Sequence, residues 1–364
     1  MLLQWKKNPF LYRVSYAQSM RTYDLFSCII LSVLGVQSID RSPESEFAPL
    51  KRVVLAQSQY GVPTKENVEK EKIELPGPPS KYIDIEKLYG KDVAEVYPEL
   101  QKRWEAEKEN LGKVLKKYGV EVLRPRLLTE KEKKDRKEVG YTNFFARDPF
   151  FTIGPFIIEG TMKFEHRKEE VMTVRHILEQ EAEKNECLYL ATPQADRSGE
   201  FHERKGPFLE GGDVLVLNKE IFVGTSGLAS NHNGIVWLRN FLSNFDYTVT
   251  EVPLHPEILH LDCALSLVRD GLMIICEEAF LEGIPESLKE WDKITVPLED
   301  AQKLITNGLP LNEKVYVTDP EFQSSVGEQL TKRGIKVEYV DYSISRDFGG
   351  SFRCTTQPLL RKNC

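Results

Sequence analysis

Short strand-like runs alternate with longer helical patterns from about residue 50 onward. Residues 52–56 form an apolar run typical of a strand, and residues 97–118 carry apolar side chains at the 3.6-residue repeat of a helix. The apolar face of that helix contains Leu100, Trp104, Leu111, Val114, Leu115 and Tyr118. Gly119 favours the end of the helix, and residues 120–123 form the next strand-like run. The pattern therefore predicts a strand–helix–strand unit.

In the middle of the chain a hairpin precedes this pattern. Residues 149–153 and 156–158 are short apolar runs separated by Gly154 and Pro155, a pair typical of a turn. A helical pattern at residues 165–184 and a strand-like run at 187–191 follow. The next unit has strands predicted at 214–217, 221–224 and 247–252, with a helix around Ile235, Leu238 and Leu242. The unit after it has strands predicted at 263–268, 272–276 and 293–297, with a helix at 285–291. The last strand–helix–strand set is predicted at 315–318, 322–333 and 336–340.

Repetition of a small mixed sheet with one outer helix predicts the fold class. Units of about forty residues that cannot bury their own apolar faces are typical of radial repetition. About five such units fit the chain, and the N-terminal strand can pair with the strand near Cys354 to complete a closed ring. The alternative is an α/β doubly wound sheet, which would not explain the hairpins with glycine-containing turns.

Composition narrows the class of protein and partner. The chain has 364 residues, 41% hydrophobic and 29% charged, with a net charge of −7, which fits one large or two ordinary globular domains. Basic residues are dispersed, so nucleic acid is not an expected partner. The six cysteines lie far apart, which indicates neither a zinc cluster nor a dithiol motif and fits a reducing compartment. Packing in apolar runs explains Cys187, Cys263 and Cys276.

The first 45 residues differ from the rest of the chain. Residues 25–36 form an apolar run behind several basic residues, which resembles a signal-peptide core but is too short to span a bilayer. Residues 38–46 are polar and contain proline, as in a linker. We interpret residues 1–45 as an extension, with a targeting segment or an over-long start as alternatives, and residues 46–364 as a single catalytic domain. We expect a cytoplasmic location and no association with membranes.

Reactive side chains come just before the first strand of successive units. They are Asp148, Glu210, Asp213, His260, Asp262 and Cys354. Equivalent positions in a ring of repeats converge on its axis, so these groups are expected to meet there. Taken singly, the acids could cap turns, the histidine could be a satisfied core residue and the cysteine a structural thiol. Taken together, they favour a functional site.

The environment of Cys354 suggests a nucleophile. Gly349 and Gly350 allow a positive φ and a close backbone approach, and Arg353 beside the thiol would favour the thiolate. A cysteine with a histidine and acids suggests covalent catalysis, and the remaining carboxylates suggest a planar cation such as guanidinium. A cysteine protease instead needs an oxyanion hole and has no use for two carboxylates around the electrophile.

These motifs resemble the guanidino-group-modifying superfamily, which comprises arginine deiminases, dimethylarginine dimethylaminohydrolases and amidinotransferases. The resemblance covers roughly residues 47–361 and is most specific at Arg147-Asp148, Glu210-Gly211-Gly212-Asp213, His260-Leu261-Asp262 and residues 349–354. It implies an α/β fold, a pentein-type five-bladed αβ propeller of repeated ββαβ units with helices outside and the active site on the axis. It also implies no metal and no organic cofactor.

The resemblance assigns roles to individual residues. Cys354 would be the nucleophile and His260 the general acid and base, oriented by Glu210. Asp148 and Asp262 would hold the guanidinium group of the substrate. Asp213 and Arg353 are further candidates for contact with the substrate.

Two branches of the superfamily stay open. The Glu210 motif is similar to the hydrolases, residues 226–242 are similar to the glycine amidinotransferases, and residues 358–361 are similar to the deiminases. We favour hydrolysis of L-arginine or a related guanidino compound to a ureido product through an amidino-cysteine, with amidino transfer to an amine as the alternative. A catalytically silent propeller that acts as a binding protein is the alternative of another class.

The motifs assign no residue to the far end of the substrate. Residues 225–229 lack the arginine that deiminases generally use for the substrate carboxylate, and Arg346, Arg353 and Arg175 are the candidate substitutes. The expected partner is a small guanidino substrate, and a homo-oligomer is left open.

Overall fold

The computed structural model describes residues 45–71, 80–184 and 187–362. All of them belong to one compact unit, Arg41–Cys364. The apolar run at residues 25–36 lies outside the described residues, and the boundary expected near residue 45 stays a prediction. Within the described part of the chain, no helix is both long enough and apolar enough to cross a membrane.

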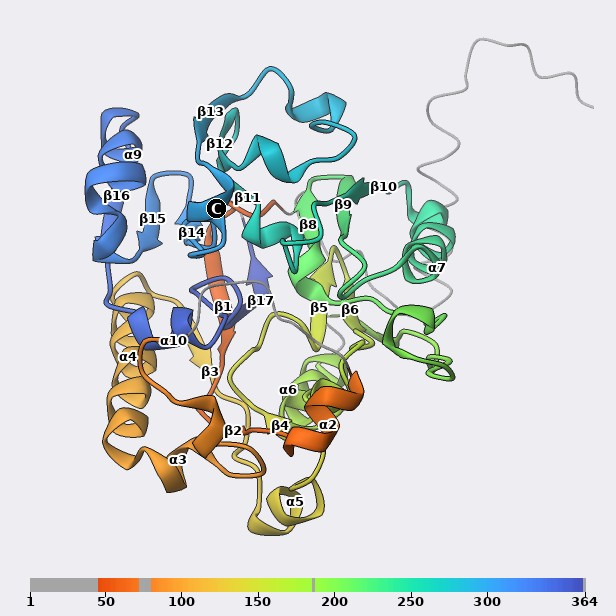
Figure 1. Ribbon diagram of the computed structural model, residues 1–364. Coiled ribbons are helices and arrows are strands. Elements are labelled where there is room, and N and C mark those ends of the chain that lie inside the picture. Colours follow the sequence, from red (N-terminus) through yellow and green to blue (C-terminus); the bar gives the residue numbers. More distant parts are fainter. Residues whose placement is uncertain (1–44, 72–79, 185–186, 363–364) are drawn as a thin grey trace, which may run out of the picture. The chain divides into compact units, whose positions relative to one another are not determined.

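Five small sheets share one strand arrangement (Figure 1). Each has an antiparallel pair of strands and a third strand that runs parallel to the central one. The sheets are β5 (Phe150–Ile153), β6 (Phe156–Glu159) and β7 (Leu188–Ala191); β8 (Val214–Leu217), β9 (Glu220–Thr225) and β10 (Thr248–Pro253); β11 (Leu265–Arg269), β12 (Leu272–Ile275) and β13 (Asp292–Thr295); β14 (Leu309–Asn312), β15 (Val315–Thr318) and β16 (Lys336–Tyr339); and β17 (Thr356–Arg361), β1 (Leu50–Leu55) and β3 (Glu121–Leu123). A two-stranded pair joins β2 (Tyr60–Gly61) and β4 (Tyr141–Thr142).

This arrangement confirms the repeated unit and the α/β class. The sheets are separate, so a single doubly wound sheet is not the architecture of the described residues. The predicted pairing of the N-terminal strand with the last strand is present, because β1 runs antiparallel to β17 from Leu55 opposite Thr356 to Leu50 opposite Arg361. In Figure 1 the strands β5, β8, β11, β14 and β17 lie toward the middle of the unit.

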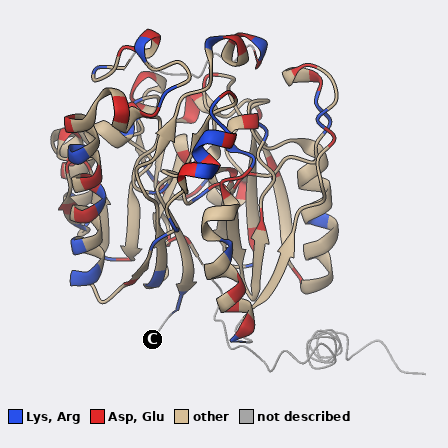
Figure 2. Ribbon diagram, turned by 90° about the horizontal axis from the view of Figure 1, so that it is seen from below, with Lys and Arg blue, Asp and Glu red and all other residues tan. Residues whose placement is uncertain are grey.

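The longer helices lie outside the sheets (Figure 1). α4 (Pro98–Lys117) matches the predicted helix, and its side chains Trp104, Leu111 and Leu115 are fully buried. The other α-helices of the described residues are α2 (Lys65–Glu71), α3 (Val93–Val96), α5 (Glu130–Asp135), α6 (Val171–Glu183), α7 (His232–Leu242), α8 (Leu298–Ala301), α9 (Glu328–Lys332) and α10 (Ser343–Asp347). Acidic and basic residues are mixed along these helices and the loops (Figure 2), as the dispersed charges of the sequence predict.

Some elements differ between the prediction and the structure. β14 was not predicted, because Pro310 within it lacks an amide N–H and interrupts the strand pattern. The helix predicted at residues 285–291 is only a short 3₁₀ turn at Glu286–Leu288. The helix predicted from residue 165 begins at Val171, and a separate 3₁₀ turn at Glu165–Arg167 precedes it. That turn places the side chain of Arg167 in the candidate site.

Candidate active site

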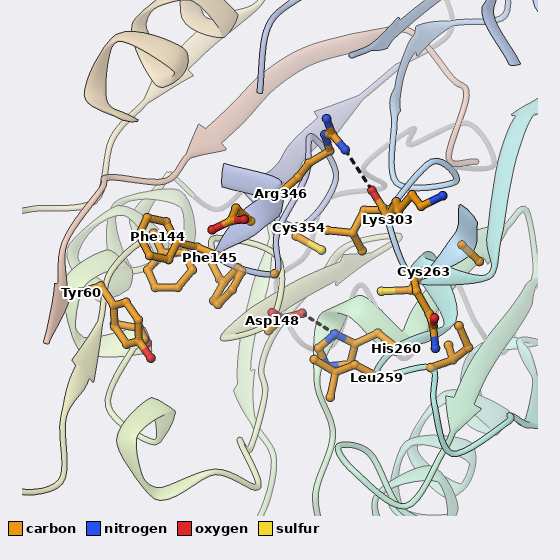
Figure 3. A pocket seen from close by; sticks show the side chains of 18 of the residues that line it. Tyr60, Phe144, Phe145, Asp148, Leu259, His260, Cys263, Lys303, Arg346 and Cys354 are labelled. Carbon is orange, nitrogen blue, oxygen red and sulfur yellow. Dashed lines mark hydrogen bonds and ion pairs between the residues drawn. The ribbon is translucent and has the colours of Figure 1, made fainter. Parts of the chain in front are cut away.

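A cavity of about 230 Å³ opens where the turns before β5, β11 and β17 meet (Figure 3). Asp148 precedes β5, His260 precedes β11 and Cys354 precedes β17, and the three side chains line this cavity. The three turns therefore converge at one cavity, as the sequence predicted for these three residues. Glu210, Asp213, Asp262 and Arg353 lie behind the cavity wall and are buried.

The backbone around Cys354 is held from both sides. Its amide N–H donates to the side-chain Oδ1 of Asn307 at 3.0 Å, and its carbonyl accepts from the amides of Ala146 and Arg147 at 3.2 and 3.1 Å. Gly349 has φ 84°, a value that a side chain would strain. A Cβ at Gly350 would lie 2.3 Å from the ring of Phe145, so only glycine fits. The glycine pair is thus required to bring the thiol to the cavity.

His260 and Glu210 form a buried pair. His260 Nε2 lies 2.9 Å from Glu210 Oε2, and the other carboxylate oxygen accepts from the amide of Lys163 at 2.9 Å. Burial by itself lowers the pKa of His260, but the carboxylates of Asp148, Asp213 and Glu210 outweigh it and raise that pKa well above the ordinary value. The imidazole is therefore protonated at neutral pH and can act first as an acid.

Asp148 lies on the other side of the imidazole ring. Its Oδ1 is 3.8 Å from His260 Nδ1 and accepts from the amide of Gly212 at 2.9 Å. A Cβ at Gly212 would lie 2.6 Å from that oxygen and 2.7 Å from His260 Nδ1, so the second glycine of the Glu210 motif permits this packing. Burial opposes ionisation of Asp148, but the charges of His260 and Arg167 outweigh it and lower its pKa. Asp148 is therefore an anion facing the cavity.

Arg167 links the acids of the site, and no feature of the sequence pattern singled it out. Its guanidinium donates to Asp148 Oδ2 at 2.7 Å and to both oxygens of Glu170 at 2.7 and 2.9 Å, and it lies 3.6 Å from Glu210 Oε2. It also lies over the ring of Phe145, 4.4 Å from the centroid. The sequence pattern predicted one continuous helix at residues 165–184, and in such a helix Arg167 would not have been expected to face the cavity. In the structure Arg167 lies in the 3₁₀ turn before α6.

Asp262 lies beneath two thiols. Its Oδ2 is 3.8 Å from Cys354 Sγ, and its Oδ1 is 3.6 Å from Cys263 Sγ. The sequence pattern explained Cys263 by packing alone, yet it lines the cavity beside Cys354 (Figure 3). Its hydrogen bond to Cys354, together with burial and the charge of Asp262, raises the pKa of Cys263 well above the ordinary value. Cys263 therefore stays a neutral thiol.

The structure does not bring Asp213 or Arg353 to the cavity. The carboxylate of Asp213 accepts from the amides of Ser230 and Leu261, both at 3.1 Å, and so connects the turn after β9 to the turn that carries His260. Burial raises the pKa of Asp213 to about 7. Asp213 does not line the cavity, and its observed role is to join these two turns, so its expected contact with the substrate stays a prediction.

Arg353 is an internal cation. Its guanidinium donates to Glu46 at 3.0 and 3.1 Å, to Asp262 Oδ2 at 3.0 Å and to the carbonyl of Val214 at 2.8 Å. Arg353 does not line the cavity, and its guanidinium is satisfied within the protein interior, so its expected contact with the substrate stays a prediction as well. The guanidinium pairs with Oδ2 of Asp262, the oxygen that lies 3.8 Å from Cys354 Sγ.

The pairing of Glu46 with Arg353 predicts a pH-dependent stability. Burial opposes ionisation of Glu46, but Arg353 and Arg147 outweigh it and lower its pKa to about 2. Because the folded-state pKa is lower than that of the unfolded chain, this stabilisation is present at neutral pH and is lost as the pH falls from about 4.5 toward about 2. We expect the unfolding free energy to fall over this range by on the order of 3 kcal/mol, measured by denaturant titration.

Glu46→Gln should remove this part of the pH dependence, whatever its effect on stability at neutral pH. Glu99→Gln is the control, because Glu99 forms an exposed surface pair with Lys102 at 2.7 Å. Equal acid slopes in wild type and Glu46→Gln would contradict the role given to Glu46.

The remaining cavity wall combines aromatic and charged groups. Phe144, Phe145 and Tyr60 line the side near Asp148, and His166 beside them has its pKa lowered to about 3 by burial and by nearby arginines, so it is neutral. Of the three arginines considered for a substrate carboxylate, only Arg346 lines the cavity. It is paired with Asp319 at 3.2 Å and with Glu321. Among the described residues, no group of three or more histidine, cysteine or acidic side chains is arranged to hold a metal ion.

Comparison with known proteins identifies the family. A family model described as N,N dimethylarginine dimethylhydrolase, eukaryotic, matches residues 83–361. The chain belongs to this family. The matched region contains all seven predicted site residues, from Asp148 to Cys354. The family is one of the guanidino-group-modifying enzymes that the motifs resemble, so the predicted superfamily is confirmed.

Individual relatives lie in more than one branch of the superfamily. An uncharacterized protein of Bacillus subtilis, YkgA, is 34% identical over 154 residues, which cover 42% of this chain and 52% of YkgA. The chain thus spans about half the length of that relative. Inosamine-phosphate amidinotransferase 1 of Streptomyces griseus is 26% identical over 290 residues, covering 73% of this chain and 83% of that protein.

Solved structures share the architecture. The S. griseus amidinotransferase superposes with a TM-score of 0.69 at 21% identity, covering 89% of this chain and 98% of that chain. The dimethylarginine dimethylaminohydrolase of Pseudomonas aeruginosa, in complex with citrulline, superposes with a TM-score of 0.60 at 15% identity, covering 85% and 100%. At these identities the likeness establishes a shared α/β fold.

Proposed function

We propose that this chain hydrolyses a guanidino substrate to a ureido product and an amine or ammonia through a covalent amidino-cysteine intermediate. The observation that carries the proposal is the arrangement of Cys354, of Asp148 and of His260 paired with Glu210 around one cavity. Family membership supports an enzyme that acts on guanidino groups. The five sheets with inner strands and outer helices support a five-bladed αβ propeller with this site on its axis.

The anionic groups match a guanidinium ion. Asp148 faces the cavity as a carboxylate and can accept from two N–H groups of the substrate. Asp262, 3.8 Å from the thiol of Cys354, can accept from the nitrogen that lies next to the attacked carbon. Held in this way, the guanidinium carbon lies over the sulfur atom, and the positive charge of the substrate is balanced by nearby carboxylates.

The first half-reaction forms the covalent intermediate. The thiolate of Cys354 attacks the guanidinium carbon, and the C=N electron pair moves to nitrogen to give a tetrahedral adduct. As the adduct collapses, the C–N bond to the departing amine breaks, and that nitrogen takes the proton of His260. The amidino group is then bound to sulfur, and His260 is neutral.

The second half-reaction releases the product. Water attacks the amidino carbon and gives one proton to neutral His260. The C–S bond then breaks to restore the thiolate, and the remaining hydroxyl proton is lost to solvent to leave the ureido carbonyl. Glu210 keeps the imidazole in place through both proton transfers, since its Oε2 is 2.9 Å from His260 Nε2 and its Oε1 is held by the amide of Lys163. One imidazole thus serves both halves.

The backbone at Cys354 argues against acyl transfer. In hydrolases that act on a carbonyl, the amide N–H of the nucleophile commonly stabilises the developing oxyanion. Here that N–H donates to Asn307, which lies behind the cavity wall and is fully buried. A guanidinium substrate develops no oxyanion in the first step, so this use of the amide fits the proposed substrate class.

Transfer of the amidino group to an amine is the second candidate, supported by the S. griseus relative. The deciding experiment incubates the enzyme with arginine, methylated arginines, agmatine or guanidinoacetate while the concentration of glycine or another amine rises. We expect a ureido product at a rate that added amine does not change. A new guanidino product that grows in proportion to the amine would establish transfer instead.

A catalytically silent binding protein is the alternative of another class. Cys354 should then react with iodoacetamide no faster than Cys276, which is buried near the end of β12. Faster alkylation of Cys354, located by peptide mass spectrometry, supports the enzyme. A cytoplasmic location, the absence of a cofactor and the oligomeric state stay predictions.

A further inference from the structure

Asn307 connects the two turns that carry the nucleophile and Asp262. Its side-chain Oδ1 accepts from the amide of Cys354 at 3.0 Å, and its Nδ2 donates to the carbonyl of Asp262 at 3.2 Å. Its own carbonyl accepts from the amide of Arg353 at 3.2 Å. The two turns are 92 residues apart in sequence, and Asn307 reaches both while being fully buried.

The segment before Asn307 is shaped for this position. Leu304 has φ 66°, an unusual value for a leucine, and the amide of Asn307 donates to its carbonyl at 3.1 Å. The hydroxyl of Thr306, the residue before Asn307, donates to the carbonyl of Cys263 at 2.6 Å. The segment before β14 therefore approaches the Asp262 turn through two consecutive side chains, and only Asn307 also reaches the Cys354 turn.

An amide is the side chain that suits both partners. The Cys354 partner is an N–H group and needs an acceptor, whereas the Asp262 partner is a carbonyl and needs a donor. Asparagine supplies one of each in a short, rigid group, and aspartate supplies only acceptors. Because both backbone groups are buried, removing the amide would leave an unpaired donor and an unpaired acceptor.

We propose that Asn307 is a positioning residue that sets the placement of the Cys354 thiol relative to Asp262. The inference rests on the proposed function for its catalytic meaning, since the thiol attacks a carbon whose nitrogen Asp262 holds. The Cys354 thiol and the Asp262 carboxylate must keep their 3.8 Å separation while the substrate carbon approaches the thiol from the cavity. Displacement of a reacting group by about 1 Å can cost a factor of about 100 in rate.

The test compares wild type with Asn307→Ala and Asn307→Asp. Asn231 provides a matched control, because its amide also joins separate backbone groups: it accepts from the amides of Phe208 and Gly234 at 3.0 and 3.1 Å and donates to the carbonyl of Lys205 at 2.9 Å. Asn231→Ala should therefore lower stability through a similar loss without touching the Cys354 or Asp262 turns. All measurements use temperatures at which thermal unfolding shows each variant to be folded.

Two readouts separate positioning from stability. With a guanidino substrate that the wild-type enzyme converts, we expect Asn307→Ala to lower kcat about 10- to 100-fold while KM changes less than about threefold. Without substrate, alkylation of Cys354 by iodoacetamide at neutral pH should slow, because the thiol is displaced. Asn307→Asp, which keeps the acceptor for Cys354, should recover part of both, and Asn231→Ala should match wild type in both.

The outcomes are decisive in either direction. The proposal is overturned if folded Asn307→Ala keeps the wild-type kcat and the wild-type rate of alkylation of Cys354, or if Asn231→Ala changes both to the same extent. The alkylation readout needs no substrate. If wild type turns over none of the guanidino compounds, the proposed function fails, yet alkylation still decides whether Asn307 positions the thiol.

Discussion

Cys354→Ala is expected to abolish turnover of any guanidino substrate while the protein stays folded. The thiol forms the covalent bond to the guanidinium carbon, and its partners in the site, Asp262 and Cys263, cannot replace it: Asp262 is a carboxylate and Cys263 is held as a neutral thiol. The measurement is steady-state product formation by mass spectrometry, with thermal unfolding as the check on folding.

Cys276→Ala is the control for this variant. Cys276 is buried at the end of β12 and does not line the cavity, so its replacement removes a thiol of similar burial without removing the nucleophile. We expect this variant to retain turnover. Residual activity of Cys354→Ala within about tenfold of wild type would be incompatible with covalent catalysis at this residue.

His260→Ala is expected to lower turnover by a factor of about 100 to 10,000, the usual contribution of general acid–base catalysis. In wild type the carboxylates around His260 raise its pKa, so the proton that the departing amine needs is already present at neutral pH. Without the imidazole, the adduct forms slowly or does not resolve. Mass spectrometry of the intact variant after incubation with substrate should show one amidino group retained on Cys354.

Glu210→Gln gives a graded comparison for His260. It keeps the shape of the side chain and the contact with the amide of Lys163 but removes the charge beside Nε2, so both half-reactions should slow without a complete stop. The combined His260→Ala and Glu210→Gln variant should be no slower than His260→Ala alone, because Glu210 acts through the imidazole. Independent, multiplicative losses would show that Glu210 has a role of its own.

Much of this architecture follows from local sequence. Alternating apolar runs, glycine-containing turns and one strong amphipathic helix depend on neighbours a few residues apart, so the repeated unit was predictable. The pairing of the first and last strands was inferred from the closure of a ring of such units and not from a local pattern. The reactive residues were predictable for the same reason: each of Asp148, His260 and Cys354 lies directly before an inner strand, and repetition brings such positions together. Pro310 misled the pattern only because it breaks the local rule for a strand.

Only the folded structure shows which charged residues line the cavity and which pair with one another in the interior. Glu46 and Arg353 are 307 residues apart, and only the fold shows that their pairing turns Arg353 away from the cavity. Asp213 binds two backbone amides, Arg167 reaches the acids from a turn, Cys263 lies beside the nucleophile and Asn307 joins two distant turns. The local pattern identified Asp148, His260 and Cys354 as residues that meet at the cavity. Their directions and hydrogen-bond partners depend on contacts between segments far apart in the chain, and no local pattern encodes such contacts.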